Sequence, residues 1–191
     1  MPDIIIRNIS KAFAENDVLK AFSAVIPAGE ISCLMAPSGR GKTTLLRILM
    51  GLEQPDSGHI SGVTGFRLSA VFQEDRLCEN LSPVTNIRLV CRSHSTRAVI
   101  DALNAAGLSG CIGQPVRELS GGMRRRVALL RALMADYDIL FLDEPFKGLD
   151  AAAKATVMAQ TRKHIQGKTV LLVTHDPQEA QTLGAGTIIT L

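Results

Sequence analysis

Short runs of apolar residues recur along the chain, separated by polar segments and by turns rich in Pro and Gly, and they predict β-strands. These runs fall at residues 4–6, 22–26, 31–35, 67–72, 139–142, 170–173 and 187–190, with a further short strand within the Gly- and Pro-rich segment 51–65. Apolar residues at helical spacing predict helices over residues 42–50, 86–90, 96–106, 122–135 and 151–165, and Pro177 begins a last helix. Because strands and helices alternate, the pattern predicts an α/β fold with a mostly parallel sheet.

One stretch of the chain departs from this alternation. Between residues 74 and 118 the pattern is helical with polar breaks. We therefore expect a single domain over residues 1–191, in which 1–73 and 119–191 form the core and 74–118 form a helical subdomain inserted into it. A length of 191 residues and a hydrophobic content of 46% are sufficient for one domain with a substantial core.

The composition excludes several classes of function. A net charge of +3 lacks the concentrated basic face of a nucleic-acid binder, so we expect no nucleic-acid partner. The three arginines at 124–126 are interpreted as a solvated or salt-bridged helix face. The four cysteines form no Cys-x-x-Cys pair, so no zinc or redox motif is predicted. With no signal-peptide pattern and no apolar stretch of about 18 residues, we expect a soluble protein that reaches a membrane only by docking onto another subunit.

A phosphate-binding loop is predicted between the apolar run 31–35 and the helix that follows it. The backbone N–H groups of such a loop surround phosphate oxygens, and Lys42 would reach the β- and γ-phosphates. The Thr43 hydroxyl would bind Mg²⁺. Residues predicted to contact the nucleotide are Ala36, Pro37, Ser38, Gly39, Arg40, Gly41, Lys42, Thr43 and Thr44. Ala36 stands where the usual pattern has Gly, and because Ala tolerates a positive φ poorly, we expect it to disturb the loop or weaken nucleotide binding.

Further polar residues follow predicted strands, where ligands bind in an open parallel sheet. Asp143 would hold Mg²⁺ and Glu144 would act as the general base for an attacking water, although an acidic pair can also simply cap a strand. His175 could sense the γ-phosphate or be a structural histidine. Gln73 could contact Mg²⁺ or water at a hinge. Phe13 could stack on a base or merely pack in the core.

Residues 119–123, Leu-Ser-Gly-Gly-Met, complete a set that resembles the ATP-binding-cassette (ABC) family. Lys42 falls in the Walker A motif of that family, and Asp143 and Glu144 fall in Walker B. Residues 119–123 match the signature motif, Gln73 matches the Q-loop and residues 148–150 match the D-loop. His175 matches the switch histidine, and Phe13 falls at the position of the adenine-stacking aromatic. The resemblance implies the ABC ATPase fold: an α/β phosphate-loop NTPase with a mostly parallel sheet core, an antiparallel β edge and a small helical subdomain. It also implies binding of ATP and Mg²⁺.

The resemblance further implies a head-to-tail dimer with a second ABC subunit, identical or different. ATP would lie between the Walker A motif of one chain and Ser120, Gly121 and Gly122 of the other. Each pair of subunits would dock on a membrane permease, which makes the expected location cytoplasmic and peripheral on the inner face of the cell membrane. The stretches 71–77 and 141–146 are similar to importer ATPases of the nitrate, sulfonate and taurine group.

We therefore expect an ATP-hydrolysing subunit that powers an ABC transporter, more specifically an importer. Two alternatives stay open: a soluble ABC ATPase with no role in transport, and a nucleotide-sensing module with little turnover. A phosphate-loop GTPase is disfavoured, because the chain contains no Asn-Lys-x-Asp motif. The transported solute is not encoded in these motifs.

Overall fold

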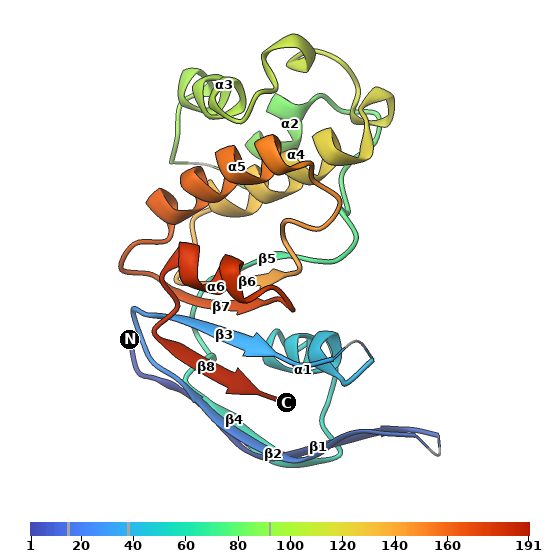
Figure 1. The fold of residues 1–191 in the computed structure, drawn as a ribbon, viewed down its shortest axis with the longest axis vertical. Coiled ribbons are helices and arrows are strands. Elements are labelled where there is room, and N and C mark those ends of the chain that lie inside the picture. Colours follow the sequence, from blue (N-terminus) through green and yellow to red (C-terminus); the bar gives the residue numbers. More distant parts are fainter. Residues whose placement is uncertain (15, 38, 92) are drawn as a thin grey trace.

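A five-stranded parallel sheet forms the centre of the molecule (Figure 1). The computed structural model describes residues 1–14, 16–37, 39–91 and 93–191. The sheet consists of β3 (Ile31–Met35), β5 (Leu68–Val71), β6 (Ile139–Asp143), β7 (Thr169–Val173) and β8 (Thr187–Thr190), in the order β5-β6-β7-β3-β8. Every residue of β6 and β7 is buried, as expected for central strands covered on both faces. The predicted parallel sheet is confirmed.

A second, three-stranded sheet is antiparallel and has the order β2-β1-β4. It comprises β1 (Ile4–Phe13), β2 (Asn16–Ile26) and β4 (Ser57–Ser61). β1 and β2 are longer than the apolar runs 4–6 and 22–26, because their pairing continues through exposed polar residues to the Phe13–Asn16 pair. Backbone hydrogen bonds between the two strands, rather than apolar content, set the length of this hairpin.

Helices cover both faces of the parallel sheet. On one face, α1 (Lys42–Leu49) packs between the two sheets and shares a core with β1, β2, β3, β6 and β7 (Figure 1). On the other face, α4 (Gly121–Leu133), α5 (Ala151–His164) and α6 (Pro177–Leu183) bury residues such as Leu129, Val157 and Leu183 against the sheet. The bounds of these four helices lie within two residues of the predicted ranges. In the helical segment, α2 (Pro83–Arg88) begins three residues before the predicted start at residue 86.

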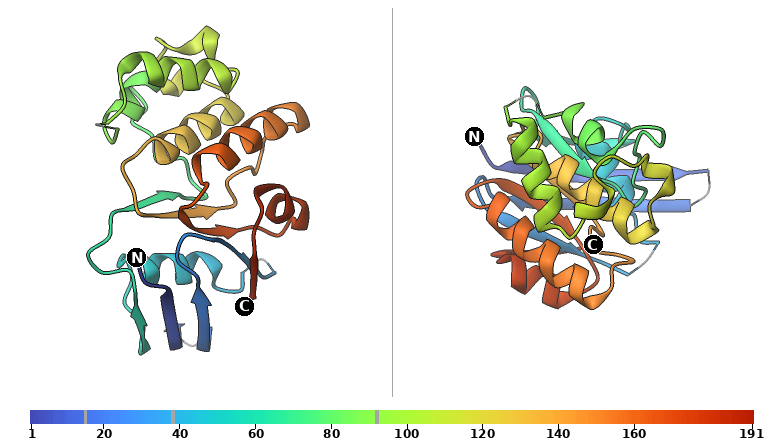
Figure 2. Two further views of the ribbon diagram at one scale, coloured as in Figure 1. Left: turned by 90° about the vertical axis from the view of Figure 1, so that its left-hand side faces the viewer. Right: turned by 90° about the horizontal axis from the view of Figure 1, so that it is seen from above.

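The segment 74–118 contains α2 (Pro83–Arg88), α3 (Thr96–Ala105) and two 3-10 turns, η1 (Ser109–Cys111) and η2 (Val116–Glu118). These elements form a third core that includes Ile87, Leu103 and Val116 (Figure 2). The helix α4 contributes Val127 and Leu130 to this same core. The described part of the segment has no strand, and its division from the core at residue 118 stays a prediction.

Side-chain caps fix where several of the helices begin, whereas α1 follows Gly41 and has no such cap. The Ser120 hydroxyl accepts a hydrogen bond from the N–H of Met123 at the start of α4, and Asp150 caps α5 in the same way through Ala153. Such a cap satisfies an N–H group that has no partner within the helix. None of the described helices is both long enough and apolar enough to span a bilayer.

Candidate active site

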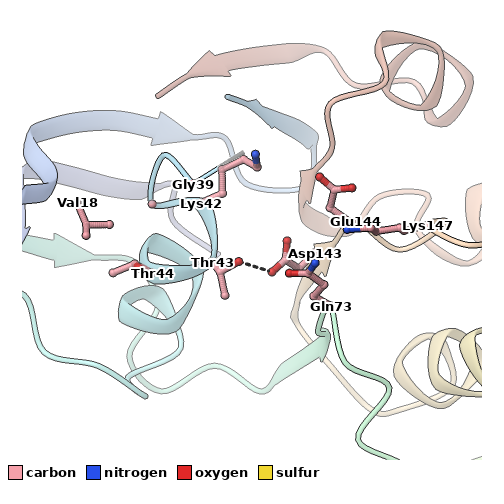
Figure 3. A pocket seen from close by; sticks show the side chains of 10 residues that line it. Val18, Gly39, Lys42, Thr43, Thr44, Gln73, Asp143, Glu144 and Lys147 are labelled. Atoms are coloured by element: carbon pink, nitrogen blue, oxygen red, sulfur yellow. Dashed lines mark hydrogen bonds between the residues drawn. The ribbon is translucent and has the colours of Figure 1, made fainter. Parts of the chain in front are cut away.

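The order of the strands brings three separated sequence motifs to one edge of the parallel sheet. Because β6, β7 and β3 are neighbours and parallel, their carboxyl ends lie side by side. The loop after β3, the acidic pair at the end of β6 and the segment after β7 therefore meet there. A cavity of about 500 Å³ opens at this point (Figure 3). It is lined by Val18, Gly39, Gly41, Lys42, Thr43, Thr44, Gln73, Asp143, Glu144 and Lys147.

The loop between β3 and α1 wraps around the Lys42 side chain. The Lys42 ammonium donates hydrogen bonds to the carbonyls of Ala36 (2.6 Å) and Pro37 (3.0 Å), and Lys42 is only 8% exposed. Gly39 and Gly41 have φ angles of 78° and 83°, which favour glycine. The tight turn therefore holds a positive charge at the mouth of the cavity, beside the N-terminus of α1. Ser38, also predicted to contact nucleotide, lies outside the described residues.

The expected disturbance at Ala36 is not found. Among residues 36, 37 and 39–41, only the two glycines have a positive φ, so the Ala36 backbone is in a region that alanine adopts readily. Ala36 is buried, and its carbonyl accepts the Lys42 hydrogen bond. The expectation was wrong for the loop backbone, because the left-handed residues in the described part of this loop fall three and five residues later. The effect of Ala36 on nucleotide binding stays a prediction.

Thr43 and Asp143 face one another across the cavity floor. The Thr43 hydroxyl donates to Asp143 Oδ2 at 2.9 Å (Figure 3). Asp143 is 2% exposed, and this burial raises the pKa of its carboxyl, while the hydrogen bond from Thr43 acts in the opposite direction. The result is a pair of hard oxygen donors in a low-dielectric pocket, which is the donor chemistry that Mg²⁺ prefers.

Glu144 sits on a strained turn directly after β6. Its φ is 46°, and its N–H donates to the carbonyl of Val173 on the neighbouring strand at 2.9 Å. A non-glycine residue in this region costs about 1–3 kcal/mol and persists only where its surroundings fix it. The carboxylate faces His175, whose Nδ1 lies 3.0 Å from Oε1. The two predicted catalytic residues are therefore in direct contact, with Glu144 largely buried and the His175 side chain 69% exposed.

Other predicted residues differ in their distance from the cavity. Gln73 lines it from the segment after β5 and Thr44 from α1. Phe13 does not line it: this side chain is 47% exposed at the end of β1, with Lys11 Nζ 5.2 Å from its ring. Arg40 borders a neighbouring hollow. Base stacking by Phe13 stays a prediction.

The signature residues Ser120, Gly121 and Gly122 are not among those that line the cavity. Ser120 and Gly121 are exposed at the N-terminus of α4, and no atom lies within 4 Å of where a Cβ on Gly121 would stand. The helix terminus with its free backbone N–H groups is thus open on the surface. Its contact with a nucleotide on another chain stays a prediction.

Sequence reasoning missed three residues of this region. Val18 on β2 and Lys147 line the cavity without belonging to any motif that was singled out. Arg125 is buried at 4% exposure and pairs with Asp75. Of the interpretation of arginines 124–126 as a solvated or salt-bridged face, the solvated alternative was therefore wrong for its central member. Arg125 lies four residues before the core residue Leu129 and therefore on the buried stripe of the helix, a spacing that was available in the sequence.

The fold and the cavity define a phosphate-loop nucleotide-binding protein. A family model described as ABC transporter matches residues 19–147, and the chain belongs to this family. It is accordingly an ATP-binding subunit with ATPase activity, as the motifs predicted.

Individual relatives support the same assignment. The aliphatic sulfonates import ATP-binding protein SsuB 1 of Rhodococcus jostii is 41% identical over 181 residues, which cover 92% of this chain and 74% of that protein. The sulfate/thiosulfate import ATP-binding protein CysA of Caulobacter vibrioides is 35% identical, covering 94% of this chain and 59% of that protein. The dimeric structure of MJ0796, a bacterial ABC transporter cassette, superposes with a TM-score of 0.85 at 27% identity, covering 98% of this chain and 94% of that chain. The predicted ABC ATPase fold is confirmed.

Proposed function

We propose that this chain supplies the energy for an importer of small solutes by closing and opening as a dimer of cassettes. The observation that carries the proposal is the convergence of Lys42, the Thr43–Asp143 pair and Glu144 on one cavity. His175 does not line this cavity but contacts the Glu144 carboxylate. The direction of transport is supported by relatives that are named import proteins. Because those relatives are named for sulfonates, sulfate and, in Spiroplasma citri, spermidine and putrescine, the solute itself is left open.

The triphosphate of ATP would lie along the loop that ends at Lys42. Backbone N–H groups of residues 39–41 and the N-terminus of α1 would bind its oxygens, and the Lys42 ammonium would exchange its two carbonyl acceptors for phosphate oxygens. Thr43, Asp143 and Gln73 would hold Mg²⁺, which when bound neutralises charge on the phosphates. The described residues contain no group of three or more His, Cys, Asp or Glu side chains for a metal, which suits an ion held mostly by phosphate and water.

Glu144 would take the proton of the attacking water. The His175 imidazole, in contact with the Glu144 carboxylate, would orient it, and Gln73, which also lines the cavity, would help to hold the water. Ser120, Gly121 and Gly122 would approach the γ-phosphate of ATP bound to a partner cassette, since their exposed helix terminus favours an anion. A membrane permease would be the second partner and would hold the dimer at the inner face of the cell membrane.

Replacing Glu144 with Gln tests the dimer cycle. The amide keeps the size of the side chain but cannot accept the proton of the attacking water, so ATP binding should survive while hydrolysis falls by about 100-fold or more. The E144Q protein with ATP and Mg²⁺ should therefore elute as a dimer in gel filtration, whereas the wild type returns to a monomer as it turns over.

Glu79→Gln is the matched control, since Glu79 is an exposed glutamate outside the cavity and its variant should cycle like the wild type. A monomeric E144Q protein that still binds ATP would contradict the proposed dimer of cassettes. No phosphate release by the wild type, with E144Q behaving identically, would favour a nucleotide-sensing module instead. Purification of the tagged chain from membranes together with a polytopic protein separates the transport role from that of a soluble ABC ATPase.

A further inference from the structure

The guanidinium of Arg125 lies inside the molecule, between the two loops that carry Gln73 and Glu144. Arg125 projects from α4, five residues after Ser120, and its side chain is only 5% exposed. A buried arginine keeps its charge and must place all five N–H groups in hydrogen bonds. The partners of those five groups indicate what this side chain does.

Three consecutive backbone carbonyls at the end of β6 accept hydrogen bonds from this single side chain. Nη2 donates to the carbonyls of Asp143 at 2.9 Å and Glu144 at 2.7 Å, and Nε donates to the carbonyl of Pro145 at 3.0 Å. These are the residues on either side of the turn at which Glu144 has a positive φ. The guanidinium therefore holds this turn in the conformation that directs the Glu144 carboxylate toward His175.

The remaining donor, Nη1, binds the segment that follows β5. It donates to the carbonyl of Phe72 at 2.5 Å, to the carbonyl of Gln73 at 3.4 Å and to Asp75 Oδ1 at 3.3 Å. The Asp75 carboxylate compensates the buried positive charge. One planar group thus connects the loop of Gln73, the loop of Glu144 and the helix that begins at the signature residues.

We propose that Arg125 is a positioning residue for ATP hydrolysis, which holds Gln73 and Glu144 in place in the cavity lining through their backbone. The proposal rests on the roles proposed above for those two residues. Arg125 itself does not line the cavity, so it acts through the loops and not on the substrate. A lysine, with one ammonium on a flexible stem, cannot reach three carbonyls on one side and two on the other in a fixed plane.

The neighbouring Arg126 provides a matched control. It lies on the same helix and also donates to backbone carbonyls, those of Ala106 at 2.7 Å, Gly107 at 3.3 Å and Gly122 at 3.3 Å. The first two acceptors belong to the helical segment and the third to α4 itself, so none belongs to the loops of Gln73 and Glu144. Loss of Arg126 therefore removes hydrogen bonds from a guanidinium to backbone carbonyls without touching those two loops.

The test compares Arg125→Met and Arg126→Met in the full-length protein. Methionine keeps much of the side-chain volume and removes the donors. We expect R125M to lower kcat by about 100-fold, since small displacements of catalytic groups cost that much, while the Kd for a fluorescent ATP analogue changes by no more than about threefold. R126M should keep kcat within about threefold of the wild type at a comparable loss of melting temperature.

A double-variant cycle distinguishes positioning from a general structural role. If Arg125 acts through Glu144, adding R125M to E144Q should slow single-turnover hydrolysis by no more than about threefold, because the group that it positions is already disabled. If R125M does not fold, R125K is measured in its place and should show intermediate kcat with unchanged ATP affinity.

Three results would overturn the proposal: wild-type kcat in R125M (or in R125K, where that variant stands in for it), equal losses of kcat in R125M and R126M, or full additivity with E144Q. Failure of the proposed function would look different, because the wild type would then hydrolyse no ATP or E144Q would hydrolyse it normally.

Discussion

At the scale of single residues, the phosphate loop contains two glycines with nearly the same backbone angles and different surroundings. Gly39 has a φ of 78° and no atom within 4 Å of where a Cβ would stand. Gly41 has a φ of 83°, and a Cβ there would lie 2.7 Å from the carbonyl oxygen of Val18 and 2.9 Å from Val18 Cγ1. The second glycine is therefore required both by conformation and by the close approach of β2.

This difference predicts unequal effects of the two alanine substitutions. Gly39→Ala should lower the free energy of unfolding by about 1–2 kcal/mol, the cost of a left-handed alanine. Gly41→Ala should lower it by a larger amount, because a contact of 2.7 Å with backbone requires the loop or β2 to move. Urea denaturation of the nucleotide-free protein measures both values. Equal losses of unfolding free energy in the two variants would mean that β2 moves away from residue 41 with no loss of stability.

At the scale of elements, a side-chain pair joins the beginnings of β5 and β6. Asp138 accepts from the Arg67 N–H at 2.9 Å and from two nitrogens of its guanidinium, Nε at 3.2 Å and Nη2 at 3.0 Å. The hydrogen bonds from the Arg67 side chain and backbone lower the pKa of Asp138 to about 2. The pair helps to fix the register of two neighbouring parallel strands whose carboxyl ends carry Gln73 and Asp143.

The lowered pKa of Asp138 predicts how stability depends on pH. A carboxyl whose pKa is about 2 in the folded chain and about 3.9 when unfolded stabilises the fold above pH 4, and this contribution is lost as the pH falls toward 2. Asp138→Asn should therefore be less stable than the wild type at neutral pH, and the difference should shrink between pH 4 and 2. Asp17→Asn, which removes an exposed partner of Lys20, is the control. A pH-independent difference in denaturant unfolding would contradict the assignment.

At the scale of the whole molecule, the helix α4 contributes side chains to two cores, and its N-terminus lies at an exposed surface. Leu129 and Leu133 pack beneath the parallel sheet, while Val127 and Leu130 pack against α2 and α3. Its N-terminus, with Ser120 and Gly121, is exposed outside the cavity that holds Lys42. A complete site would then require a second copy, arranged so that each chain gives its signature residues to the other.

Mixing two inactive variants tests this arrangement. Lys42→Ala removes a phosphate-binding charge, and Ser120→Asp keeps a good helix cap while placing a negative charge where the partner's γ-phosphate would lie. Each variant alone should be inactive. A mixed dimer regains one site, formed by the intact loop of the S120D chain and the intact signature of the K42A chain, so partial phosphate release should return on mixing. No recovery, with dimers present, would mean that each chain uses its own Ser120.

Much of the fold and of the candidate site could be predicted from the sequence, because the patterns that indicate them involve residues close together along the chain. The run 31–35 became β3 with the predicted bounds, since a short run with four apolar residues of five before a glycine-rich turn has few other conformations in a core. Lys42, Thr43, Asp143 and Glu144 were found through neighbouring residues along the chain. The lengths of β1 and β2 were missed, because pairing between strands sets them and pairing is not visible in one strand alone.

Residue types at short spacing were enough to identify the class of protein, the position of the phosphate loop and the order of the motifs. Which residues contact one another depends on the three-dimensional fold. It buried Arg125 among carbonyls of two distant loops, placed His175 against Glu144, left Phe13 outside the cavity and kept Ala36 out of the left-handed region. These outcomes follow from strand order and long-range packing, which bring together residues that are far apart along the chain.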